Sequence, residues 1–476
     1  KVEHAKALTT LEPSLEPIPS AKNQVPVEGV SAKPQRQPSE KNKPIRKRWF
    51  IGSAVVGLGV IFVLIKVLTG GGTTPPVPTI TPAPTTSAAI MTEIPPPPTD
   101  TAATPIPTQA PVEIAGKITL WYVELEDQEE LAFSNLIDRM EEAFPKLTLF
   151  TQIVPVMDID SRYSSQVKAG LGPDLVLTGI LSVQDPSIEE SYIDISDLVK
   201  GRLDDYLPDA MIQVTNNEKV YGIPQSIQSV VFWYNKDMLP EPPATTDDLL
   251  SIMEWGSPVS MSMTNCFNNY GFYGAFGGQI FDAEGQVIAD QSQGVINAIE
   301  YLNGLNAVAK SNGWPVDESN YISFFQSGNA AGLINGNWLI NGYRAELGDK
   351  LAVTALPGGP GGPATPFYGV RAFYFNPNSE NLEVAVEVAS YLTSQESLTY
   401  MMNEAYIIPA RTDVEITDPL LKDLEKAINT GYTIPLWKGT QPQDYWANFC
   451  GLDQVFNQGM DPVDWVKTAA ENARSQ

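Results

Sequence analysis

A run of apolar residues from Trp49 to Leu68 constrains this chain more than any other feature of its sequence. Only Ser53 and Lys66 interrupt the run, and about 20 apolar residues is the length that a helix needs to cross the hydrocarbon core of a bilayer. We therefore predict a single transmembrane anchor helix over residues 49–68. A cleaved signal peptide is the less favoured alternative, because the run is long for one and no small-residue cleavage site follows it.

The residues on either side of the apolar run orient the predicted helix. Residues 1–48 carry ten Lys and Arg residues against five Asp and Glu residues, and five of the cations lie just before Trp49. Because basic flanks stay on the cytoplasmic side, we predict a disordered basic cytoplasmic tail over 1–48 and an extracytoplasmic location for the rest. Residues 69–115 contain 12 prolines and many threonines, a composition typical of an extended linker that forms no core.

Residues 116–476 have a strongly acidic composition, with 19 Lys and Arg residues against 48 Asp and Glu residues. Such a surface repels nucleic acid, although acidity can also serve only to keep an exposed protein soluble. Cys266 and Cys450 are not in a metal-ligand spacing, and the single histidine, His4, precedes the apolar run. We expect no metal, no cofactor and no nucleic-acid partner for this part of the chain.

From Gly116 onward, strand-like and helix-like patterns alternate. Helical periodicity follows the first strand as far as Met140 and returns over 382–392, where Asn376 to Ser379 is expected to supply the cap. Strand, helix and strand in this order predict an α/β fold with a parallel sheet. About 360 residues exceed a typical single domain, which predicts two lobes. The predicted strands are 117–123, 147–154, 174–178, 230–234, 330–334 and 371–375.

Eight short stretches, in order and with similar spacing, resemble the large solute-binding proteins of ABC importers. The pattern is most similar to the maltodextrin-binding type, and it spans nearly all of the chain after Gly116. No single stretch is specific, but their order and spacing together are. The stretches are Ile118–Trp121, Ala169–Asp174, Tyr221–Pro224, Trp233–Asp237, Leu239–Pro243, Gly332–Trp338, Leu356–Pro360 and Tyr368–Val370.

The resemblance implies a two-lobed periplasmic-binding-protein clamshell of type II. Lobe one would comprise residues 116–227 plus 371–410, and lobe two residues 228–370 plus 411–476. Such a protein needs two rigid walls, a hinge, and a ligand that binds the closed state better than the open one. The implied partners are a small solute and an ABC transporter permease, with the binding protein itself a monomer.

The same resemblance points to ligand-binding residues. Trp338 and Trp446 take the positions of aromatic residues that stack on sugar rings, where an indole covers the apolar face of the ring; simple packing is the alternative for both. The other candidate ligand-binding residues are Gln228, Asn265, Phe267, Thr178 and Glu126.

These five candidates depart from the maltodextrin-binding pattern. Gln228 and Asn265 stand in place of glutamates, Phe267 in place of a tyrosine and Glu126 in place of a lysine. Thr178 begins a stretch, continuing to Ser182, that lacks the aromatic and charged contacts of the relative. Because amides still donate and accept hydrogen bonds, we expect a neutral carbohydrate other than maltose.

A dense group of amide and aromatic residues between Asn265 and Tyr273 is open to two interpretations. It either forms a wall of the site or supplies ordinary turn chemistry. Cys450 takes the position of a cleft arginine, with Cys266 near that arginine's neighbours, so the resemblance implies a Cys266–Cys450 disulfide; two buried thiols are the alternative.

Three functions remain open from the sequence. The first is capture of a solute for an importer, and the second is a receptor that reports the ligand to a membrane partner. The third, a glycoside-acting enzyme, is disfavoured because no carboxylate pair and no nucleophile motif stands out. We therefore expect no catalytic residues.

Overall fold

The structure is a computed structural model of the 476-residue chain and describes residues 113–180, 190–434 and 441–475. The predicted tail, the predicted anchor helix and residues 69–112 of the predicted linker lie outside these ranges. Within them, no helix combines the length and the apolar character needed to cross a membrane.

A six-stranded sheet forms the core of what we call lobe one, with strand order β12-β6-β11-β3-β1-β2. β1 pairs in parallel with both β2 and β3, whereas β11 and β12 pair antiparallel with their neighbours. The sheet is therefore mixed, and only its β3-β1-β2 part matches the predicted parallel arrangement. Its strands are β1 (Gly116–Val123), β2 (Leu147–Val154), β3 (Leu175–Ile180), β6 (Gly222–Gln228), β11 (Gly369–Phe375) and β12 (Ile408–Pro409).

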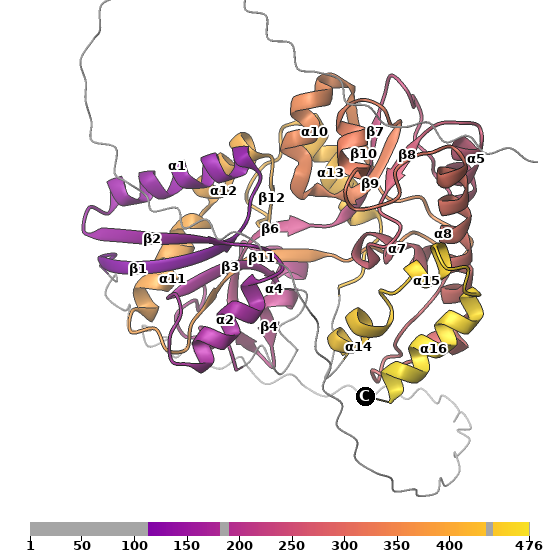
Figure 1. The fold of residues 1–476 in the computed structure, drawn as a ribbon. Coiled ribbons are helices and arrows are strands. Elements are labelled where there is room, and N and C mark those ends of the chain that lie inside the picture. The colour runs from indigo at the N-terminus through magenta and orange to yellow at the C-terminus, as the bar shows by residue number, and fades with distance from the viewer. Residues whose placement is uncertain (1–112, 181–189, 435–440, 476) are drawn as a thin grey trace, which may run out of the picture. The chain divides into compact units, whose positions relative to one another are not determined.

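The helices of lobe one bury their apolar faces against this sheet. In α1, Phe133, Leu136 and Met140 recur at helical spacing and are almost fully buried, as expected for an amphipathic helix. Figure 1 shows α1 above the sheet and α2 below it. The lobe-one helices are α1 (Asp127–Ala143), α2 (Ile159–Lys168), α4 (Pro208–Val214), α11 (Leu382–Leu392) and α12 (Gln395–Ala405), and β4 (Thr215–Asn216) and β5 (Lys219–Val220) form a small hairpin.

A four-stranded sheet of order β10-β7-β9-β8 forms the core of lobe two. β7 pairs antiparallel with β9 and β10, and β8 pairs in parallel with β9. Its strands are β7 (Val230–Asn235), β8 (Val259–Met261), β9 (Gly332–Gly336) and β10 (Leu351–Thr354).

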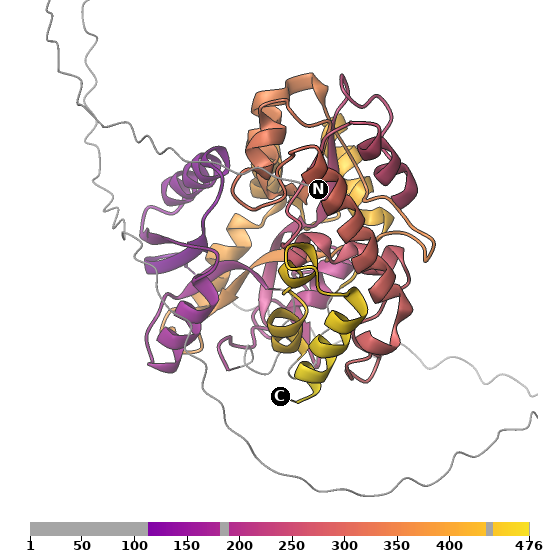
Figure 2. The same cartoon turned by 45° about the vertical axis from the view of Figure 1, so that its right-hand side comes forward.

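Helices from three stretches of the chain cover lobe two. α13 contacts β10 and β7, and α15 and α16, which are among the yellow C-terminal helices in Figures 1 and 2, contact α8. The helices are α5 (Thr246–Glu254), α6 (Cys266–Asn269), α7 (Gly271–Ala275), α8 (Gln293–Ser311), α9 (Tyr321–Gln326), α10 (Ile340–Leu347), α13 (Pro419–Thr430), α14 (Gln441–Asn448), α15 (Asp453–Phe456) and α16 (Pro462–Arg474), with 3₁₀ turns η1 (Ala289–Gln291), η2 (Asn337–Leu339) and η3 (Gly348–Lys350).

Ser229 alone separates β6 of lobe one from β7 of lobe two, and it is fully buried. Its N–H donates to Oδ1 of Asn337 at 3.0 Å, and its hydroxyl donates to the carbonyl oxygen of Phe367 at 2.9 Å. Phe367 precedes β11, where the chain returns to lobe one. Two passages between the lobes are thus hydrogen-bonded to each other.

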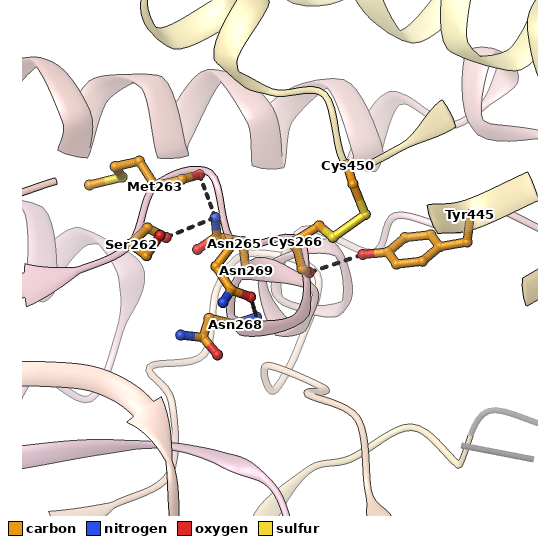
Figure 3. Close-up of a disulfide and its surroundings, with 8 residues drawn as sticks. All are labelled: Ser262, Met263, Asn265, Cys266, Asn268, Asn269, Tyr445 and Cys450. Atoms are coloured by element: carbon orange, nitrogen blue, oxygen red, sulfur yellow. Dashed lines mark hydrogen bonds between the residues drawn. A yellow bond between two sulfur atoms is a disulfide. The ribbon is translucent and has the colours of Figure 1, made fainter. Parts of the chain in front are cut away.

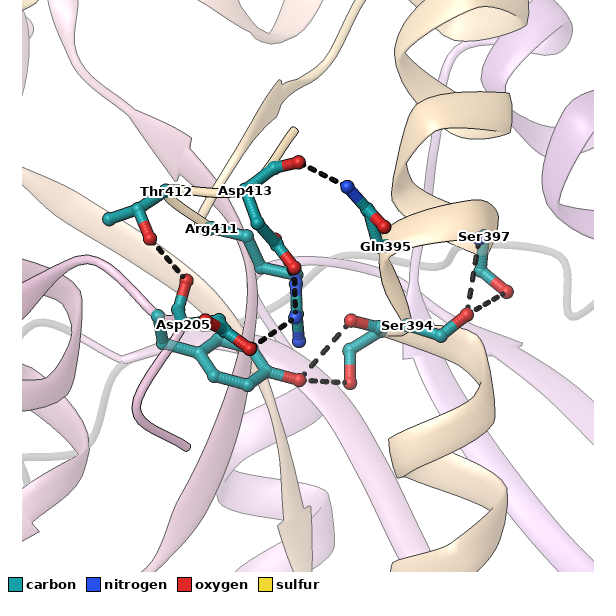
Figure 4. A network of polar contacts seen from close by, with 9 residues as sticks. Asp205, Ser394, Gln395, Ser397, Arg411, Thr412 and Asp413 are labelled. Carbon is teal, nitrogen blue, oxygen red and sulfur yellow. Dashed lines mark hydrogen bonds and ion pairs between the residues drawn. The ribbon is translucent and has the colours of Figure 1, made fainter. Parts of the chain in front are cut away.

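A polar network holds the third passage, which follows β12 (Figure 4). Arg411 binds Asp413 through Nε at 2.7 Å and through Nη2 at 2.6 Å, and the Arg411 guanidinium lies over the ring of Tyr206. Thr412 donates its backbone N–H and its hydroxyl to the carbonyl oxygen of Asp205. Because Asp205 and Tyr206 belong to lobe one, residues 411–413 stay bound to that lobe beyond the predicted crossing point.

Most predicted elements appear where expected, with two corrections. β9 begins at Gly332 rather than at residue 330, because Ala331 instead donates its N–H to the carbonyl oxygen of Pro258, ahead of β8. The predicted cap of α11 is wrong. Its N-cap residue is Asn381, which makes no side-chain cap bond, while Ser379 donates to Asp174 at 2.7 Å.

Candidate functional site

A small cavity lies between the two lobes and is lined by two of the predicted ligand-binding residues. Gln228 contributes from the end of β6 and Trp338 from the turn after β9. Gly336 leaves room for the indole of Trp338 to pack against the strand, because a Cβ at position 336 would clash with the ring. The cavity has a volume of only about 10 Å³, which is room for about one water molecule.

A buried ion pair lines the lobe-one side of this cavity. Glu129 of α1 and Arg371 of β11 are 4% and 3% exposed and bind through Oε1 and Nη2. Arg371 also donates through Nε to Oε1 of Gln225 at 2.9 Å. Because a buried charge is costly unless it is paired and hydrogen-bonded, this cluster fixes the position of α1 relative to β6 and β11.

A continuous aromatic cluster extends from Trp338, which lines the cavity, into lobe two. The ring of Phe267 meets the ring of Trp338 at 5.7 Å, measured between centroids, and that of Phe367 at 5.4 Å. Phe367 in turn meets Trp446 at 6.3 Å. Trp446 is 38% exposed, whereas Phe367 is fully buried. Three predicted residues, Trp338, Phe267 and Trp446, are therefore joined through one residue, Phe367, that the sequence did not single out.

Glu126 bridges the lobes. It is the N-cap residue of α1, in the turn after β1, and its side chain accepts hydrogen bonds from the backbone N–H groups of Asn341 at 3.0 Å and of Gly342 at 3.1 Å. These groups open α10, whose N-cap residue, Leu339, supplies no side-chain acceptor. A carboxylate at this end of a helix is favourable because it satisfies free N–H groups and interacts well with the helix dipole. Burial raises the pKa of Glu126, while the hydrogen bonds from α10 oppose that rise.

Two further contacts from α10 reach lobe one. Asn341 donates through Nδ2 to the carbonyl oxygen of Ala405 at 3.1 Å. The guanidinium of Arg344 lies 4.2 Å from the ring centroid of Tyr406 and also binds Asp418 at 2.6 Å. Tyr406 has a left-handed backbone with φ of 53°. The lobes therefore meet along the whole first half of α10.

The remaining predicted residues serve mainly structural contacts. Asn265 caps α6 by accepting from the N–H of Asn268 at 3.0 Å, and Asn268 itself donates to Asn335. Asn269 donates to the carbonyl oxygen of Met263 at 2.6 Å. Thr178 is buried and donates to Asp160 at 3.3 Å. The amides of the Asn-rich stretch therefore make turn and packing contacts, while the ring of Phe267 belongs to the aromatic cluster.

Cys266 and Cys450 are joined by a disulfide, the pairing that the resemblance implied. It links the start of α6 to the chain after α14 (Figure 3), and Tyr445 donates to the carbonyl oxygen of Cys266 at 3.0 Å. The bond therefore holds the C-terminal helices against α6, which carries Phe267. No group of three His, Cys, Asp or Glu side chains among the described residues is placed to hold a metal ion.

One signal in the sequence could have revealed the Glu129–Arg371 pair. Glu129 lies four residues before Phe133 and seven before Leu136, so the helical period places its carboxylate on the buried face of α1. A carboxylate on such a face needs a partner. Phe367 and Asn341 gave no comparable signal, because their roles depend on contacts between distant segments.

Comparison with known proteins decides what kind of molecule carries this site. Residues 135–428 match the family model described as "Bacterial extracellular solute-binding protein". The chain belongs to this family. The relatives described below are solute-binding proteins. This chain is likewise a solute-binding protein and not an enzyme.

The curated relatives of this solute-binding protein are identical to it at about a quarter of the aligned residues. The maltotriose-binding protein of Pyrococcus abyssi is 25% identical over 366 residues, which span 69% of this chain and 76% of the relative. The maltodextrin-binding protein MdxE of Bacillus subtilis is 27% identical over 267 residues, 48% of this chain and 62% of the relative. The galactooligosaccharide-binding protein of Bacillus subtilis is 24% identical over 76% of this chain and 89% of the relative.

Solved structures share the two-lobed α/β fold. The GacH receptor of Streptomyces glaucescens has a TM-score of 0.69 and 18% identity, covering 76% of this chain and 98% of its own. The maltose/maltodextrin-binding domain MalE of Bdellovibrio bacteriovorus has a TM-score of 0.68 and 19% identity, covering 76% and 99%. The predicted clamshell fold is confirmed by these matches.

Proposed function

We propose that this chain captures a neutral carbohydrate between its lobes and delivers it to an ABC importer, held at the membrane by the helix over residues 49–68. The observation that carries the proposal is the position of Trp338. Its half-buried indole lines the interlobe cavity together with Gln228 and contacts Phe267. Aromatic faces with neutral hydrogen-bonding groups suit the apolar and hydroxyl surfaces of a sugar ring.

The relatives support a carbohydrate ligand. Those from Pyrococcus and Bacillus are named for maltotriose, maltodextrin and galactooligosaccharide. The side chains that line the interlobe cavity include one acid and one base, Glu129 and Arg371, and these two bind each other. A charged solute therefore finds no spare counterion among these described residues, whereas a neutral one needs none.

Binding at this site requires the lobes to separate. A cavity of about 10 Å³ admits no sugar ring, so the contacts of Glu126 and Asn341 with the opposite lobe have to break for the solute to enter. The single residue between β6 and β7 is suited to absorb such a rotation, because hinges need only a few residues that change backbone angles.

Thermal unfolding and calorimetry of the full chain test the ligand class. The panel holds maltotriose, galactooligosaccharides, polyols, amino acids and polyamines, and a ligand at 100 times its dissociation constant stabilises by about 2.7 kcal/mol. We expect a neutral saccharide to raise the melting temperature and Trp338→Ala to weaken its binding by about tenfold or more. Trp255→Ala is the matched control, because Trp255 is 82% exposed at the end of α5.

The delivery and anchoring parts of the proposal need separate experiments. Saccharide-loaded protein should stimulate the ATPase activity of its importer, and deletion of residues 49–68 should move the protein out of the membrane fraction. A response to a polyamine or an amino acid with none to any saccharide would refute the ligand class.

A further inference from the structure

Lobe two contains a second cavity, of about 440 Å³, that shares no lining residue with the cavity at Gln228 and Trp338. Ligand pockets in proteins commonly measure about 300 to 1,000 Å³, so this space is large enough for a small solute. It is built from α7 and the loop after it, from Thr365, and from residues 433, 434 and 441.

Two tyrosines of this cavity have hydroxyls without hydrogen-bond partners among the described residues. Tyr273 is 3% exposed, and its ring meets the ring of Tyr270 edge-on, with centroids 5.7 Å apart. Within the part of the chain that the structure describes, neither hydroxyl makes a hydrogen bond. Burial raises the pKa of Tyr270 to about 12 and that of Tyr273 further, so both remain neutral and each offers one donor and an acceptor. Neither hydroxyl oxygen is sealed from solvent, and both tyrosines line the cavity, so their hydroxyls are available to a solute that enters it.

The other lining groups are apolar or neutral, with one exception. Phe281 presents an aromatic ring, and Gln279 and Thr365 present an amide and a hydroxyl. The exception is Asp282, whose Oδ1 accepts from the backbone N–H groups of Glu284 and Gln286 and so holds its own turn. None of the described lining residues is basic, so these residues offer a phosphate or a carboxylate no counterion.

We propose that this cavity, formed by Tyr270, Tyr273, Gln279, Phe281 and Thr365, is a second binding site for a neutral, hydroxyl-rich solute of about one sugar ring. Aromatic faces would cover the apolar side of the ring, and the two phenols and the amide would bind its hydroxyls.

The second site is physically connected to the first. Tyr270 stacks on Phe367 with ring centroids 3.8 Å apart, and Phe367 carries Phe267 and Trp446 of the interlobe cluster. The carbonyl oxygen of Phe367 also accepts a hydrogen bond from the hydroxyl of Ser229, the residue between the lobes. A series of ring contacts through Phe367 and Phe267 therefore joins Tyr270 of the second site to Trp338 of the first.

Calorimetry of the full chain with D-glucose, D-galactose and myo-inositol tests this site. In the Trp338→Ala background, which removes the interlobe indole, we expect at least one of these probes to bind with one equivalent per chain. Adding Tyr273→Phe should weaken that binding by about tenfold, the loss expected for one hydrogen bond to a ligand, and Gln279→Trp should block the cavity from its exposed rim. Tyr234→Phe is the matched control, since Tyr234 lies on β7 and lines neither cavity.

The outcomes separate this site from the interlobe one. If no probe binds to Trp338→Ala, or if binding is unchanged by both Tyr273→Phe and Gln279→Trp, the second site does not exist. A third result is saccharide binding that Trp338→Ala leaves unchanged, together with binding of a probe that Tyr273→Phe weakens. That result would support the second site and contradict the proposed function. Circular dichroism of each variant verifies its fold.

Discussion

The Oε2 atom of Glu126 lies 3.0 Å from the backbone nitrogen of Asn341, across the boundary between the two lobes. The same carboxylate accepts from Gly342 at 3.1 Å, so a residue of lobe one provides the cap that α10 of lobe two lacks. The interlobe contact is therefore part of the hydrogen bonding of a helix end and is lost whenever the lobes separate.

Glu126→Ala should shift the chain toward separated lobes. The variant loses two hydrogen bonds across the lobe boundary, each worth about 1 kcal/mol after competition with water, and their sum corresponds to about a 30-fold change in the equilibrium between lobe arrangements. Small-angle scattering without ligand should show a larger radius of gyration. Glu124→Ala is the control, because Glu124 is exposed at the same end of β1. An unchanged radius for Glu126→Ala would mean that the carboxylate does not hold the lobes together.

The same carboxylate makes lobe closure depend on pH. Burial raises the pKa of Glu126 above 4.5 in the closed arrangement, and separation of the lobes returns the carboxyl to water and to its ordinary pKa. Protons favour the state with the higher pKa. Closure should therefore strengthen as the pH falls through the raised pKa toward 4.5, and weaken as it rises. Scattering across this range should show the trend in the wild type and lose it in Glu126→Gln; a trend that persists in Glu126→Gln would assign it to another group.

The sequence predicted those helices and strands that are defined by a pattern within their own residues. The strand over 147–154 was predicted to the residue, as was the helix over 382–392, because an apolar run or a helical period defines each of them. The predicted cap at 376–379 failed because its polar side chains bind a distant partner. Ser379 donates to Asp174, 205 positions away in the sequence, and no local pattern encodes that contact.

The candidate site was predictable only in part for the same reason. Resemblance placed Trp338, Phe267 and Trp446, and the structure joins them through Phe367. The resemblance could not show that Glu126 would bind the backbone of α10, because that contact depends on how the two lobes are placed against each other. Sequence similarity transfers positions, whereas the partners of each side chain follow from packing.

Removal of the disulfide should strongly destabilise lobe two. Cys266 and Cys450 are 184 positions apart. On the chain-entropy model, closing a loop of that length reduces the conformational entropy of the unfolded chain and raises its free energy by about 5 kcal/mol. The double variant Cys266→Ser with Cys450→Ser should therefore unfold at a lower denaturant concentration, as should the reduced wild type. Thiol titration of the denatured wild type should find no free thiol before reduction and two after it. An unchanged unfolding midpoint would show that the unfolded chain is constrained without the bond.

Replacement of Glu129 by alanine should destabilise lobe one more than any exposed charge replacement. The variant leaves Arg371, which is 3% exposed, without its carboxylate partner, and an uncompensated buried charge costs about 3 to 5 kcal/mol. Denaturant unfolding at neutral pH measures this loss. Glu113→Ala is the control, because Glu113 pairs with Lys146 at 2.7 Å but both side chains are well exposed, and exposed pairs contribute little. Equal effects of the two substitutions would show that water reaches Arg371 and that the pair does not fix α1 on the sheet.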